Sequence, residues 1–186
     1  MKNLHFSTGF LLLCSWLLYT DPSGLLLQGL LACFLHELGH CFVLHYFKIH
    51  IKEINFTLFG AEIKMCCLPS YMKELLAAAA GPAVNLLLAY CFCHRPSGHI
   101  FAGMNLSLAV FNLLPVWPLD GARILRCTVG MLFCERRTYQ FCNFLSRLAS
   151  AIFLLFGFYA TFMWRNPTLL FMSFWILKSS LMEKSL

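Results

Sequence analysis

The chain contains 186 residues, of which 60% are hydrophobic and 12% are charged. Because soluble globular domains carry about 25% charged residues, this composition excludes an ordinary soluble domain. The formal net charge is +6, and we assign the excess Lys and Arg residues to loops that face anionic lipid. No basic patch is interleaved with aromatic residues, so we expect the lipid bilayer, and no nucleic acid, as a partner.

The hydrophobic residues form six long uncharged runs, and one bilayer span requires about 20 apolar residues. The runs are approximately 3–20, 22–47, 75–94, 96–119, 148–164 and 166–177. The last run is the shortest, so it spans only if Lys178 extends its amine toward the interface. The sequence therefore predicts an α-helical polytopic membrane protein with about six transmembrane helices.

The positions of Lys and Arg predict the orientation of these helices. With a cytoplasmic N-terminus, eleven of the 14 Lys and Arg residues lie on the cytoplasmic side, as the positive-inside rule requires. We find no cleavable signal peptide, because Asp21-Pro22 follow the first run in place of a site with small residues. We expect a multi-pass membrane protein with its N-terminus in the cytoplasm.

The second run contains His36-Glu37-Leu38-Gly39-His40, which places two imidazoles and a carboxylate inside a hydrophobic segment. A charge at bilayer depth costs roughly 3 kcal/mol on insertion scales, so such residues indicate function. On a helix, positions i and i+4 lie about 40° apart around the axis, so both imidazoles can bind one tetrahedral metal ion. Glu37 is close enough to take a proton from a water molecule at that ion. The pattern predicts a metal-dependent hydrolytic site with Glu37 as its base.

The depth of this site follows from Lys48, which marks the cytoplasmic boundary of the second run. At about 1.5 Å of rise per residue, His40 and His36 lie roughly 12 and 18 Å inside that boundary. Hydrolysis at this depth needs water, so other segments must enclose a cavity that opens to the cytoplasm.

A catalytic zinc ion takes three protein ligands and a water molecule, so a third ligand is required. His45 lies about 140° around the helix from His40 and faces elsewhere. Asp120 is a better candidate, because Pro115 and Pro118 must break the preceding helix and such backbone is tolerated at membrane depth only where it lines a cavity. The ligand set would then be His, His and Asp, with one Zn²⁺ per chain. The alternative is that Asp120 caps a helix over 122–133.

Two other segments suggest supporting roles. Apolar and polar residues alternate over 54–58 and 61–65 around Phe59-Gly60, which predicts a short β-hairpin at the cytoplasmic interface. Its edge could pair with an extended substrate, or the hairpin could simply plug the cavity mouth; both interpretations stay open. The small residues of AAAAGPAVN predict close helix packing, with Asn85 as a polar contact near the site.

Three motifs in order, HELGH, GPAVN (81–85) and NLLPVWPLDG (112–121), resemble the site-2 protease family of intramembrane zinc metalloproteases. The sequence of the NLLP-x-WPLDG motif is most similar to that of the sporulation branch, whose members cleave the pro-sequence from a membrane-associated pro-sigma factor. The resemblance runs from about residue 24 to 125. One departure is Ala122, where the family commonly has a second glycine after LDG.

The resemblance implies a role for each motif residue. The zinc ligands would be His36, His40 and Asp120, and the catalytic base would be Glu37. The substrate and oxyanion side of the cleft would include Asn112 and Pro115, and we add Asn85 to that side.

We therefore predict a single intramembrane metalloprotease domain over 1–186. It comprises a catalytic core at about 24–125 and further transmembrane helices at about 141–182, with no C-terminal regulatory domain. It would cleave a membrane-associated or transmembrane substrate near its cytoplasmic boundary, with a pro-sigma factor as the implied substrate and membrane inhibitor proteins as further partners. Two alternatives are a membrane metal transporter and a catalytically silent membrane scaffold. The transporter is disfavoured because the only acids placed within spans are Glu37 and Asp120.

Overall fold

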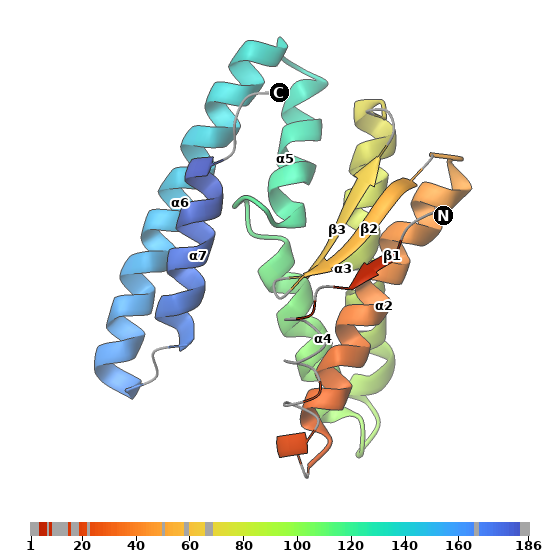
Figure 1. Ribbon diagram of the computed structural model, residues 1–186, viewed down its shortest axis with the longest axis vertical. Helices are drawn as coiled ribbons and strands as arrows, with labels where there is room; N and C mark the ends of the chain where they lie inside the picture. The colour runs from red at the N-terminus through yellow and green to blue at the C-terminus, as the bar shows by residue number, and fades with distance from the viewer. Residues whose placement is uncertain are drawn as a thin grey trace. The chain divides into compact units, whose positions relative to one another are not determined.

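The computed structural model describes residues 4–6, 8, 15, 19–21, 23–49, 51–57, 60–65, 69–165 and 168–182. These residues contain six helices and three strands, drawn in Figure 1. The chain divides into two compact units, Met1–Val110 and Phe111–Leu186.

The first unit is built on two long apolar helices, α2 (Leu25–Tyr46) and α3 (Tyr71–Cys93), which pack side by side (Figure 1). Both are long and apolar enough to cross a membrane, which confirms the helices expected in the second and third runs. Small residues allow the close approach, since a Cβ added at Gly39 would lie 2.9 Å from the Ala80 carbonyl oxygen. On the outer surface, large side chains such as Phe42 and Tyr90 are mostly exposed. An apolar outer surface of this kind suits lipid rather than water.

A three-stranded sheet completes this unit. Strand β2 (Ile51–Thr57) pairs antiparallel with β3 (Gly60–Met65) and parallel with β1 (Leu4–Phe6), so the order is β1-β2-β3. The hairpin expected over 54–65 is present in the structure as β2 and β3, and β2 begins three residues earlier than the alternation suggested. The tip of the hairpin lies outside the described residues.

Strand β1 corrects the expected first span. The expected first span begins at residue 3, but residues 4–6 form a strand whose Leu4 pairs with Ile54. A segment of three residues is too short for its sequence pattern to distinguish strand from helix, and the partner strand decides between them. Much of the remaining run to residue 20 lies outside the described residues.

Helix α4 (His99–Asn112) occupies only part of the run over 96–119. It ends three residues before Pro115, as the two prolines predict. Its 14 residues rise about 21 Å, whereas the hydrocarbon core of a bilayer is about 30 Å thick. The run is therefore a short helix followed by irregular backbone.

The second unit contains three helices, α5 (Asp120–Gly130), α6 (Glu135–Trp164) and α7 (Thr168–Met182). Helix α7 packs against α6 and runs back along it (Figure 1). The hydrophobic core of the second unit contains Val116 and Leu119, from the loop before α5, and Ile176 of α7. Helix α6 is long and apolar enough to cross a membrane, and α7 is a shorter apolar helix. The described residues thus hold three span-length helices, as a multi-pass membrane protein requires, while the count of six spans stays a prediction.

Candidate metal centre

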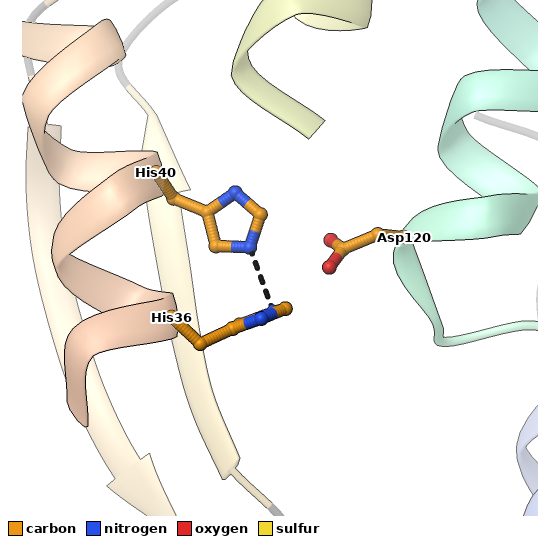
Figure 2. A group of neighbouring side chains, drawn as sticks. All are labelled: His36, His40 and Asp120. Atoms are coloured by element: carbon orange, nitrogen blue, oxygen red, sulfur yellow. Dashed lines mark hydrogen bonds between the residues drawn. The ribbon is translucent and has the colours of Figure 1, made fainter. Parts of the chain in front are cut away.

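The two histidines of HELGH lie on successive turns of α2 and point at each other. Their Nε2 atoms are 3.1 Å apart and their rings meet edge to face (Figure 2). Both side chains are buried, each with 5% of its surface exposed. This confirms the expectation that the i, i+4 spacing places both imidazoles on one face of the helix.

The Nδ1 atom of each ring faces an oxygen from α3. His40 Nδ1 lies 2.7 Å from the carbonyl oxygen of Ala77, and His36 Nδ1 lies 2.8 Å from Oδ1 of Asn85. A carbonyl oxygen only accepts hydrogen bonds, so each Nδ1 carries a proton and donates it. In the neutral rings, both Nε2 atoms therefore present lone pairs, as metal-binding imidazoles do.

The separation of these lone pairs fits a shared cation. Two nitrogens bound to one tetrahedral Zn²⁺ at about 2.0–2.1 Å lie about 3.3 Å apart, which is close to the 3.1 Å between the two Nε2 atoms. Two lone pairs at this distance repel each other unless a positive charge lies between them. The donor set of α2 therefore fits a zinc ion.

Gly81 of α3 provides the space beside the two imidazoles. A Cβ at this position would lie 2.7 Å from His36 Nε2 and would also collide with His40 Nε2. Any side chain on residue 81 would therefore compete for the volume in front of both lone pairs. The glycine of GPAVN is required for the centre as well as for close helix packing.

Glu37 follows His36 on α2 and is partly exposed, unlike the two buried histidines.

Asp120 lies in the second unit, as the first residue of α5 (Figure 2). It is buried, with 7% of its surface exposed, and Arg123 Nη1 lies 3.9 Å from its Oδ1. The N-cap of α5 is Leu119, and the helix begins two residues before the predicted start. Asp120 therefore lies in the first turn and not at the N-cap position. A carboxylate in the first turn also stabilises a helix N-terminus, so the helix-capping and metal-ligand interpretations both stay open.

The loop before Asp120 is tightly held within the second unit. A Cβ at Gly121 would collide with the backbone carbonyls of Leu113 and Leu114, so only glycine fits there. The Trp117 N–H donates to Ser146 Oγ of α6 at 3.0 Å. The irregular backbone after α4 thus has a defined conformation, and Asp120 is fixed at its end.

The remaining predicted residues fall in two places. Asn112 is the last residue of α4 and Pro115 lies in the turn that follows; both are partly exposed. Asn85 is fully buried and its amide is engaged with His36 and with Asn105 of α4. The predicted role of Asn85 as a polar contact near the site is confirmed by its hydrogen bond with His36, and its place on the substrate side stays a prediction. One available signal was the spacing of Gly81 and Asn85, which puts them on one face of α3.

Comparisons with known proteins show which class of protein this chain is similar to. Residues 97–156 match the family described as Peptidase family M50. The fold matches the solved structure of the site-2 protease from Methanocaldococcus jannaschii, with a TM-score of 0.72 and 22% identity over 100% of this chain and 93% of that chain. The resemblance to the site-2 protease family carried by the three motifs is therefore confirmed.

Two curated relatives are more specific. The chain is 30% identical to stage IV sporulation protein FB of Bacillus subtilis over 148 residues, which is 74% of this chain and 50% of that protein. It is also 30% identical to the zinc metalloprotease MJ0392 of M. jannaschii over 134 residues, 66% of this chain and 39% of that protein. The chain thus matches half or less of the length of these relatives.

Proposed function

We propose that this chain is an intramembrane zinc metalloprotease that hydrolyses a peptide bond of a membrane-associated or transmembrane protein. The observation that carries the proposal is the histidine pair of α2, with both Nδ1 protons held by oxygens and both Nε2 lone pairs convergent. A glutamate directly after the first histidine adds the base that such a site needs.

The proposed ligands are His36, His40 and Asp120, for one zinc ion per chain. Catalytic zinc takes three protein ligands, and α2 supplies two. The proposal for Asp120 is supported by its burial and by the rigid loop that precedes it. The resemblance of NLLPVWPLDG to the family motif supports the same choice.

In the proposed mechanism, the bound zinc ion supplies Lewis-acid activation of water and of the scissile carbonyl. Glu37 accepts the proton of the attacking water as the C–O bond forms. It then delivers that proton to the amine nitrogen as the C–N bond breaks. The Nδ1–H bonds hold each imidazole ring in the orientation that ligation requires. Asn112 and Pro115 are proposed to shape the substrate side of the cleft.

The sheet offers a way to present an extended substrate. β2 is the central strand, so β3 has one edge without a partner among the described strands. An extended substrate segment would add to that edge through backbone hydrogen bonds. Such pairing would help because a protease acts on extended backbone, whereas a transmembrane substrate arrives as a helix.

The proposed membrane orientation is based on the distribution of Lys and Arg, and the proposed substrate is based on similarity to the curated relatives. We propose an N-terminus in the cytoplasm, a site open to that side, six spans and one metalloprotease domain over the whole chain. The similarity to a stage IV sporulation protein favours a pro-sigma factor as the substrate. Membrane inhibitor proteins would then be further partners.

The test uses the full chain purified in detergent, with zinc content measured before cleavage of a pro-sigma factor. Glu37→Gln should abolish cleavage and retain zinc, because the amide cannot accept the proton and the ligands are untouched. The matched control is Glu135→Gln, which changes an exposed carboxylate at the start of α6 and should cleave normally. Cleavage by zinc-loaded Glu37→Gln would disprove the mechanism, and zinc uptake into vesicles without cleavage would favour the transporter.

A further inference from the structure

The inference concerns Asn105, a buried polar residue on α4 that neither the motifs nor the proposed mechanism uses. Asn105 and Asn85 are both completely buried, and their amides are joined within the first unit. Buried amides among apolar helices persist only with their hydrogen bonds satisfied. Polar residues inside such helices also indicate function by default.

The contacts of the two amides determine how each is oriented. Asn105 Nδ2 lies 2.8 Å from the carbonyl oxygen of Phe101, which can only accept, so this nitrogen donates there and Oδ1 faces away. Asn85 Nδ2 donates to that Oδ1 at 3.0 Å. The Oδ1 of Asn85 is consequently the atom that faces His36 Nδ1, at 2.8 Å. Each orientation follows from the previous one, starting from a backbone carbonyl that cannot rotate.

The two histidines differ in how their protons are fixed. His40 Nδ1 donates directly to a backbone carbonyl, that of Ala77. His36 depends on the Asn85 side chain, whose amide could turn by 180° and present Nδ2 as a donor. That change would place the His36 proton on Nε2 and remove the lone pair that a metal needs. The Asn105 contact opposes the change, because it requires Nδ2 of Asn85 for itself.

We propose that Asn105 is a positioning residue of the metal centre: it orients the Asn85 amide, and thereby holds the His36 proton on Nδ1 and leaves Nε2 for the metal. This inference rests on the proposed metal site. Outer partners of ligating histidines change metal affinity by about 10- to 100-fold when they are lost.

The first experiment measures zinc affinity by chelator competition in the full chain in detergent. Asn105→Leu should lower the affinity about tenfold. Asn105→Asp should stay close to the unmodified chain, because a carboxyl buried among apolar residues is protonated and keeps one donor and one acceptor. The matched control is Asn143→Leu, which removes another buried asparagine, on α6 of the other unit, and should leave zinc affinity unchanged. Unchanged affinity in Asn105→Leu would overturn the proposal.

A double variant separates orientation from packing. In Asn85→Leu the amide that Asn105 orients is absent, so Asn105 can no longer act on His36 through it. Adding Asn105→Leu in that background should change zinc affinity less than about twofold. An equal loss in both backgrounds would mean that Asn105 acts through packing alone. That result would refute the proposed amide relay, in which Asn105 orients the Asn85 amide and this amide holds the His36 proton on Nδ1.

The second readout needs no metal. Nitrogen NMR of the metal-free chain, with ¹⁵N-labelled histidine, should show the His36 ring protonated on Nδ1, and Asn105→Leu should populate the Nε2–H form. The His40 ring should stay protonated on Nδ1, and His36→Gln and His40→Gln variants assign the two signals. An unchanged His36 signal in Asn105→Leu would refute the relay. A chain that binds no zinc but shows this tautomer change would refute the proposed function while leaving the amide relay standing.

Discussion

The two units position their candidate ligands in different ways. In the first unit, two helical turns and the side chains and backbone of α3 orient His36 and His40. In the second unit, a proline-broken loop places Asp120 at the first turn of α5, and close backbone packing at Gly121 defines that loop. Helical spacing is a local property that survives small shifts of its surroundings. A loop position depends on each of its contacts, so the second unit should be the more sensitive to small changes in packing.

The largest expected effect is on the proposed third ligand. Asp120→Asn removes the anionic ligand but keeps the shape of the side chain, so zinc affinity should fall by more than the roughly 100-fold loss seen for outer partners. Metal content after dialysis against a chelator measures it, with circular dichroism to check the helices. Glu135→Gln, which changes an exposed acid at the start of α6, is the control. Unchanged zinc content would remove Asp120 from the ligand set.

Gly81→Ala tests the space in front of the histidines. The added Cβ would lie 2.7 Å from His36 Nε2, so the imidazoles must shift and zinc affinity should fall about 10- to 100-fold, as for other changes around metal ligands. Gly103→Ala on α4 is the matched control, since a Cβ there would meet nothing within 4 Å. Equal zinc affinity in the two variants would contradict the described histidine positions.

Gly121→Ala tests the loop of the second unit. The new methyl group would collide with the carbonyls of Leu113 and Leu114, and overpacking of this kind costs about 1–3 kcal/mol. The free energy of unfolding, measured by titration with a denaturing detergent and tryptophan fluorescence, should fall accordingly. Gly29→Ala on α2 has open space around it and should not lower stability. A Gly121→Ala chain as stable as the control would show that the loop can relax.

Ser146→Ala should have the smallest effect of the four. It removes the hydroxyl that accepts from the Trp117 N–H and pairs with Ser180, and each of these two hydrogen bonds contributes about 0.5–1.5 kcal/mol. The same unfolding titration measures it, with the exposed Ser107→Ala as control. A loss larger than these two hydrogen bonds together would mean that Ser146 stabilises the loop through more than these two contacts.

Some elements followed directly from the sequence. The apolar runs 22–47 and 75–94 predict two helices, which the structure has as α2 and α3. The pairing of His36 with His40 follows from helical periodicity. The break before Pro115 was also predictable, because proline cannot continue a helix. The start of the first span was wrong, since Leu4–Phe6 form a strand only because β2 lies beside them.

The sequence by itself determined the membrane character, the shared face of two histidines and an adjacent base, because hydrophobicity and helical spacing are local properties. Only the tertiary structure decided that Asn85 accepts a hydrogen bond from His36 and donates one to Asn105. A hydrogen bond between residues 20 or 49 positions apart depends on how helices pack, and no local pattern encodes it. The same holds for Gly81, whose missing side chain has meaning only beside the two imidazoles of another helix.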